Sequence, residues 1–240
     1  MTQPAPSERT KVRVRSHRGH YDTDTVYGII DEALVAHVGF NRQSDGHPCV
    51  IPTAHCRIGD KLYFHGSNAS TMLRDSFSMD VSIAVSIIDG LTVARSAINN
   101  SMDYRSVVVF GPAHQVVDDE EKLQVCKALV EHVIPGRWND VRHPTKKELR
   151  TTSFMAVSLA EASAKIRQGP PIDDEEDYAL PTWGGTLPIR AAYGPLVPDD
   201  RVPEGMDVPE YLTQYRREGT CPPWTRSKDD ADTRDKVATQ

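Results

Sequence analysis

Apolar and polar residues follow two different rhythms along this chain. Between residues 26 and 34, apolar side chains recur at the spacing i, i+3, i+4, i+7 and i+8, which is typical of one buried face of a helix. Asp22 and Thr23 stand just ahead of it, where a helix is capped. Two-residue alternation and short apolar runs then predict strands. These strands lie at LVAHVGF, HPCVIPTAHCR, Lys61–His65, DVSIAVSII, LTVARSA, RSVVVFGPAHQVV and Ser153–Leu159.

Two more helices are expected in the second half of the chain. Asp118 with Glu121, and Thr145 with Glu148, have the spacing of a capping box. After the first box, one helical face is predicted to consist of Leu123, Cys126, Leu129, Val130 and Val133. Because most strands follow one another through short turns, the order favours a mainly β (α+β) fold, an antiparallel barrel with peripheral helices, over alternating βαβ units.

The composition narrows the class of protein. The formal charge is −6 with neutral histidines, so general electrostatic binding to nucleic acid is not expected. No apolar run approaches the roughly 20 residues of a bilayer-spanning helix, and the opening MTQPAPSERTKVRVR lacks the apolar segment of a secretory signal. Four cysteines without a CxxC pair are typical of reduced thiols, which favours a cytoplasmic protein.

Apolar residues are spread unevenly, which suggests the domain limits. Residues 1–10 are polar, and the chain from 194 to 240 is rich in proline and charge. Such a composition buries too little surface to offset the entropy of ordering. We therefore expect a flexible N-terminus over 1–10, one folded domain over 11–193, and a C-terminal tail over 194–240. The PEYLTQY and PPW segments of the tail leave a second interpretation open, an arm that wraps a partner subunit.

The segment HGSNASTM, from His65 to Met72, has the features of a phosphate cradle. It follows a predicted strand, Gly66 permits close approach of the backbone, and free N–H groups at the start of a helical turn attract anions. Its hydroxyl groups come from Ser67, Ser70 and Thr71. An ordinary capped turn is the alternative, because serine, threonine and asparagine are the usual N-cap residues.

Further along the chain, three cations are candidates for an anion site. Arg105 stands at a strand entrance, where a guanidinium can hold two phosphate oxygens; an ion pair with Asp103 or another carboxylate is the alternative. Lys165 and Arg167 would point to one face of a strand, or form a charged strand edge. Trp183 either lies against a planar ligand or packs in a core or interface. No set of histidines and cysteines has metal-site spacing, so no metal is expected.

Several stretches in this order carry a family resemblance: HPCVIPTAHCRIGDKLYFHGSNAS, DGLTVARS, SMDYRSVVVFG, IPGRW and SAKIRQGPPIDDEEDYALPTWGGTLP. In them the chain resembles the pyridoxamine 5′-phosphate oxidase-like flavoproteins, and most closely the branch related to nitroimidazole-resistance proteins. The resemblance covers about residues 11–193. It implies a split β-barrel homodimer with two FMN sites at the subunit interface.

The resemblance also implies a role for individual residues. The strand of Ile51, Pro52 and Thr53 would line the flavin ring. The phosphate end would be held by His65, Gly66, Ser67, Ser70, Thr71 and Met72. Further FMN contacts would come from Tyr104, Arg105 and Ser106, from the late basic positions Lys165 and Arg167, and from the late tryptophan Trp183.

One departure from the family pattern concerns proton transfer. Relatives often carry a histidine just before the S-x-x-Y-R-S motif, where this chain has Asn99-Asn100 and then Asp103. An imidazole can pass protons near pH 7, whereas an amide cannot. The catalytic acid or base is therefore unassigned, and His65, Asn100 and Tyr104 are the nearest candidates.

The resemblance favours an FMN-dependent oxidoreductase that acts on a small organic substrate by two-electron transfer. The substrate and the direction of the reaction stay open. Two alternatives come from other classes: a non-catalytic split-barrel protein that binds haem or another ligand, and a dimeric interaction module with an empty cleft.

Overall fold

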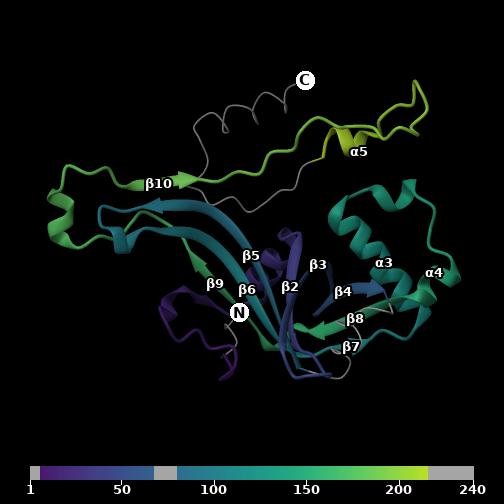
Figure 1. Ribbon diagram of the computed structural model, residues 1–240, viewed down its shortest axis with the longest axis horizontal. Helices are drawn as coiled ribbons and strands as arrows, with labels where there is room; N and C mark the ends of the chain where they lie inside the picture. Colours follow the sequence, from purple (N-terminus) through teal and green to yellow (C-terminus); the bar gives the residue numbers. More distant parts are fainter. Residues whose placement is uncertain (1–5, 68–79, 216–240) are drawn as a thin grey trace.

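The computed structural model describes residues 6–67 and 80–215 of the chain (Figure 1). The strands are β1 (Gly19–His20), β2 (Val35–Asn41), β3 (Pro48–Ile58), β4 (Lys61–Ser67), β5 (Asp80–Val93), β6 (Ser101–Pro112), β7 (His114–Gln115), β8 (Thr152–Ser158), β9 (Ala162–Arg167) and β10 (Gly185–Pro188). The α-helices are α1 (Thr23–Glu32), α3 (Asp119–Val133), α4 (Lys146–Thr151) and α5 (Glu210–Thr213). Short 3₁₀ turns are η1 (Ser16–Arg18), η2 (Ala97–Asn99), η3 (Arg137–Asp140), η4 (Leu159–Glu161) and η5 (Glu175–Ala179).

These strands form one antiparallel, unclosed sheet. Its order is β1-β9-β6-β5-β2-β3-β4-β8-β7, and β10 pairs with the far end of β5. The long strands β5 and β6 extend beyond the rest of the sheet to a tip beside β10 (Figure 1). Helices α3 and α4 lie at the opposite end, near β4 and β8 (Figure 1). The antiparallel β fold with peripheral helices that the sequence predicts is confirmed.

Helix α1 forms as its sequence pattern predicts and packs against the sheet, in the main hydrophobic core. The Asp22 carboxylate accepts a hydrogen bond from the backbone N–H of Thr25 at 2.8 Å, which caps the helix. Val26, Ile29 and Ile30 are buried among side chains of the sheet, in the main hydrophobic core. A second, smaller core lies between the sheet and α3.

Two expectations from the sequence differ from the structure. DVSIAVSII and LTVARSA are not separate strands, because Asp89 is accommodated as a bulge and β5 continues past it; the register against β6 shifts between Ile88 and Gly90. Helix α3 is buried through Val125 and Leu129, whereas Leu123 and Val133 are exposed. The predicted apolar face of α3 is therefore rotated away from the core, and part of it lines a cavity.

Residues 189–215, named here the C-terminal arm, follow β10. The arm runs across the molecule to α5, which lies near the end of α3 (Figure 1). The Tyr211 hydroxyl donates to Asp140 Oδ2 at 2.6 Å, and the Tyr215 hydroxyl donates to the carbonyl of Val133 at 2.7 Å. The end of the arm is thus attached to the same chain. No helix among the described residues has both the length and the apolar character needed to cross a membrane.

A buried ion cluster ties α1 to the sheet. The guanidinium of Arg105, only 5% exposed, donates to Asp89 at 2.8 and 2.7 Å and to Glu32 at 2.7 Å, with a second contact to Glu32. Glu32 ends α1, and Asp89 is the bulged residue of β5. Burial disfavours the charged guanidinium, but the two carboxylates outweigh it and raise the pKa of Arg105 above its ordinary value.

Replacing Arg105 should destabilise the fold strongly. In Arg105→Ala, two buried carboxylates lose their shared cation, so we expect the free energy of unfolding to fall by about 3–5 kcal/mol. Urea denaturation followed by circular dichroism measures it. Arg42→Ala is the matched control, because Arg42 pairs with Asp45 at the surface and such pairs contribute about 0–1 kcal/mol. A loss below 1 kcal/mol in Arg105→Ala would show that the cluster does not hold α1.

Candidate functional site

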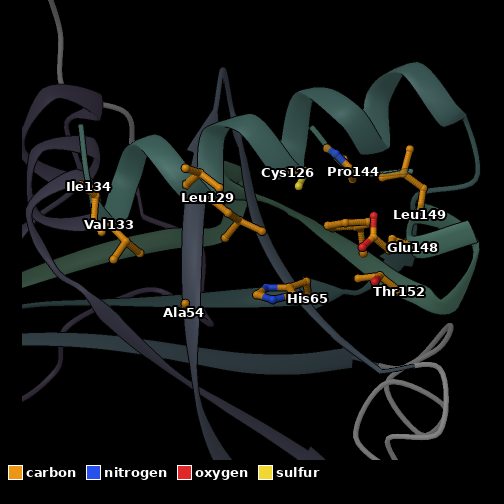
Figure 2. A pocket seen from close by; sticks show the side chains of 12 residues that line it. Ala54, His65, Cys126, Leu129, Val133, Ile134, Pro144, Glu148, Leu149 and Thr152 are labelled. Carbon is orange, nitrogen blue, oxygen red and sulfur yellow. The ribbon is translucent and has the colours of Figure 1, made fainter. Parts of the chain in front are cut away.

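A cavity of about 540 Å³ lies between the sheet and the helices α3 and α4. Its walls are almost entirely apolar, and His65 and Thr152 point into it from the sheet side (Figure 2). The lining residues are Ala54, His65, Cys126, Leu129, Val130, Val133, Ile134, Pro144, Glu148, Leu149, Thr152 and Phe154. An apolar cavity of this size with a few polar groups is the usual form of a small-molecule or cofactor site.

His65 is the one imidazole that lines this cavity among the described residues. Strand pairing places it opposite Phe154 of β8, and the two rings stack with centroids 6.1 Å apart. No hydrogen bond or ion pair joins it to other residues in the described part of the chain. Burial lowers the pKa of His65 below its ordinary value, so the ring is neutral near pH 7 and keeps a lone pair for a ligand.

Opposite His65, the α3 and α4 wall carries Cys126 and Glu148 (Figure 2). Burial raises the pKa of the Cys126 thiol, which therefore stays protonated at neutral pH. Arg142 holds the Glu148 carboxylate in a fork at 2.8 and 2.9 Å, and together with the Thr145 cap it lowers the pKa of Glu148 to about 2. The charge of Glu148 is thus balanced outside the cavity.

The residues expected to bind FMN fall into separate groups. Ile51, Pro52 and Thr53 lie on β3, beside β2, and His65 to Ser67 end β4. In the sheet, β3 and β4 are separated from β6 and β9 by β2 and β5. Ser70, Thr71 and Met72 lie outside the described residues. The phosphate cradle therefore stays a prediction.

A second group comes together on β6 and β9. Strand register places Tyr104 opposite Arg167 and Ser106 opposite Lys165, and the Ser106 hydroxyl donates to the Lys165 carbonyl at 3.2 Å. Lys165 is half-buried, and its ammonium group makes no ion pair with the described residues. The register thus places these positions side by side, while their role toward a flavin stays a prediction.

Both arginines of this group are already engaged by carboxylates. Arg105 is held by Glu32 and Asp89, as described above, and the Arg167 guanidinium contacts Asp103 and, at 2.5 Å, Thr92. Two cations thus face three carboxylates. A phosphate would have to displace these partners in a region that is already negative, so neither arginine presents a free fork to an anion.

Asp103 is the least satisfied member of this cluster. It is completely buried, and among the described residues Oδ1 has hydrogen-bond partners whereas Oδ2 has none. Burial raises the pKa of Asp103, with Asp89 adding to the effect, although Arg167 and Thr92 oppose it. Asp103 is therefore a buried carboxyl group with a raised pKa that is held against Arg167.

The remaining predicted residues lie at the tip of β5 and β6. The Asn100 side chain closes the turn there, because it accepts from the N–H of Ala94 at 3.0 Å and donates to the carbonyl of Ser96 at 2.9 Å. Trp183 is 67% exposed and lies next to Gly185, the first residue of β10. Neither side chain lines the His65 cavity.

Some residues that shape these sites carried no clear sequence signal. Asp173, which begins an acidic run, is buried and accepts from the backbone N–H groups of Arg95 and Ser96. His55 and His132 each bond a carbonyl near the end of α1, Ile30 at 2.9 Å and Ala33 at 2.8 Å. Of the cavity wall, the sequence singles out Cys126, Leu129, Val130 and Val133 as a core face, Glu148 as part of a capping box and His65 as a flavin contact, but none of them as part of an apolar cavity. Within residues 6–67 and 80–215, no cluster of three or more potential metal ligands occurs.

Comparison with solved structures reveals two relatives of nearly full length. The flavocytochrome Anf3 from Azotobacter vinelandii is 40% identical, with a TM-score of 0.83 over 89% of this chain and 99% of that one. The FAD and haem binding protein from Mycobacterium smegmatis is 32% identical, with a TM-score of 0.77 over 82% and 96% of the two chains.

More distant comparisons agree on the fold. A protein described as a 5-nitroimidazole antibiotic resistance protein, from Bacteroides thetaiotaomicron, is 22% identical with a TM-score of 0.51 over 62% of this chain and 86% of that one. No curated protein sequence gives a significant match. A family model described as pyridoxamine 5′-phosphate oxidase matches residues 22–166, more than half of the chain. The chain therefore belongs to the pyridoxamine 5′-phosphate oxidase family.

Proposed function

We propose that this protein is a flavin- and haem-binding redox protein that passes electrons between the two cofactors and a small molecule. The observation that carries the proposal is the similarity, along almost their whole length, to a flavocytochrome and to a protein that binds FAD and haem. It joins the two leading hypotheses from the sequence, a flavin oxidoreductase and a haem-binding split barrel.

The His65 cavity supports the haem part of this proposal. A haem needs a volume of several hundred Å³, apolar walls and a neutral imidazole or another axial donor. The cavity offers about 540 Å³, walls built from α3, α4 and β8, and His65 with its lowered pKa. Cys126 is less suited as a donor, because its raised pKa keeps the thiol protonated.

The flavin part rests on different residues. Since Arg105 and Arg167 are engaged by carboxylates, Lys165 is the cation of the predicted set that is available to a phosphate. On β3, the side chains of Ile51 and Thr53 are at least partly exposed, and they would contact the flavin ring. We favour FAD over FMN, because the 32% identical relative binds FAD.

The protein's own groups would bind, orient and shield these cofactors. A bound flavin supplies two-electron chemistry and a bound haem supplies one-electron chemistry. Phe154 stacks on His65 and limits the rotation of its ring, and the apolar wall of α3 excludes water from one side. Tyr104 stays the candidate for moving a proton, because His65 is assigned to the haem and Asn100 closes the turn at the tip.

We also propose that the protein acts as a homodimer with flavin at the subunit interface. Large apolar side chains are exposed on β3, β5 and β6, and exposed apolar patches often mark an interface. They include Val50 and Ile51 on β3, Ile88 and Leu91 on β5, and Met102 on β6.

The absorbance spectrum of the purified protein tests the cofactor pair. We expect flavin bands together with a Soret band, and we expect His65→Ala to lose or shift the Soret band while the flavin bands persist. His47→Ala is the matched control, because His47 lies on the surface outside the cavity. A protein that takes up neither cofactor would refute the proposal. An unchanged Soret band in His65→Ala would show that a residue other than His65 holds the haem.

Chromatography of the nucleotide that acid releases from the protein distinguishes FAD from FMN, and we expect FAD.

Lys165→Ala should weaken flavin binding by about 1.5–3 kcal/mol, the contribution of one hydrogen bond to a charged group. Lys127→Ala, on the exposed side of α3, should leave it unchanged. Equal affinity of wild type and Lys165→Ala would show that the phosphate lies elsewhere.

A further inference from the structure

A second hollow, of about 710 Å³, lies where the C-terminal arm meets the end of α3. One side consists of Val133 and Ile134, and the other side comes from the arm. The arm residues are Tyr193, Gly194, Pro195, Leu196, Leu212, Thr213 and Tyr215. The two sides are about sixty or more positions apart in the sequence, so the hollow exists only because the arm returns to α3.

Several phenol contacts hold the two sides in place. The Tyr211 hydroxyl accepts from Arg137 Nη1 at 2.7 Å and donates to Asp140, and the Tyr215 hydroxyl donates to Val133. Gly136 has φ of +89°, and a Cβ there would approach Tyr211 Cβ to 3.1 Å. The glycine therefore suits both the backbone turn and the close packing of the tyrosine.

The lining decides which chemistry the hollow can accept. None of the nine described residues that line the hollow carries a charge at neutral pH, so a charged ligand would lose hydration without gaining a partner among them. The rings of Tyr193 and Tyr215 meet edge to face, 4.7 Å apart at 87°, and therefore offer a ring face and a ring edge to a planar molecule. The hydroxyls of Thr213 and Tyr215 already donate to the carbonyls of Glu210 and Val133, so the described lining offers a ligand mainly apolar and aromatic contacts.

The hollow adjoins the proposed haem cavity. Val133 and Ile134 line both spaces, so a molecule in the hollow would be separated from the His65 cavity by the thickness of these two side chains. Quinones are one class of uncharged planar molecule that exchanges electrons, and they would suit the proposed redox function. This step rests on the proposed redox function, whereas the fit of an uncharged aromatic molecule rests on the lining alone.

We propose that the hollow between the C-terminal arm and α3 binds an uncharged, planar aromatic molecule of the naphthoquinone type. Its volume lies within the range of about 300–1,000 Å³ that is usual for small-molecule sites. The arm is then a wall of a binding site, in addition to any contact that it makes with a second subunit.

Isothermal titration of the purified protein with menadione, 2-methyl-1,4-naphthoquinone, tests this directly. We expect saturable binding at one site per chain and at least tenfold weaker binding to Leu196→Trp, which fills the hollow. Val197→Trp is the matched control, because Val197 is the next residue, is 87% exposed and does not line the hollow. Thr213→Trp fills the hollow from α5 and serves if Leu196→Trp does not fold.

The contrary outcomes are distinct. Unchanged affinity in both filling variants would overturn the proposal, as would equally tight binding of the charged analogue 1,4-naphthoquinone-2-sulfonate. Binding that occurs only in haem-free protein would place menadione in the His65 cavity instead. If Leu196→Trp changes the sedimentation coefficient but not menadione binding, the hollow is a subunit contact. Since titration needs no cofactor, the absence of both flavin and Soret bands would refute the proposed function while leaving this result intact.

Discussion

The guanidinium of Arg105 is the constraint on which the arrangement of this protein depends. It joins the last residue of α1 to the bulged residue of β5 inside a region with almost no water. In such a place a charge is tolerated only with partners, and the partners come from two segments that must both be positioned correctly. The ion cluster therefore couples the placement of α1 in the core to the course of β5 and β6 toward the tip.

The same cluster changes how the family motif is interpreted. Residues that the resemblance implies as cofactor contacts, Arg105 and Arg167, are used within the chain to neutralise Glu32, Asp89 and Asp103. With three carboxylates against two cations, the surroundings do not favour a further anion. Lys165 keeps its ammonium group available among the described residues, and burial holds the pKa of Asp103 above its usual range. The three cations Arg105, Lys165 and Arg167 look equivalent in the sequence, but in the described part of the structure carboxylates engage both arginines and not Lys165.

Helix α3 connects the cavity, the arm and the second core. Val125 and Leu129 anchor it against the sheet, which leaves Cys126, Val130 and Val133 free to form the wall opposite His65. Its last turn also carries the carbonyl that binds Tyr215 of the arm. Because one helix supplies surfaces to both hollow spaces, the proposed haem and quinone-type sites share side chains. A substitution of Val133 would therefore change the lining of both sites.

Local patterns in the sequence determined the elements of this protein, and tertiary structure decided the use of their side chains. The capping residues Asp22, Asp118 and Thr145 begin helices as predicted, since capping depends on atoms three residues apart. The hairpin of β3 and β4 likewise follows from local alternation. By contrast, the bulge at Asp89, the partners of Arg105 and the exposure of His65 toward a cavity depend on segments that meet only after folding. Those contacts join residues tens of positions apart, and their energies come from burial and pairing, which no local spacing records.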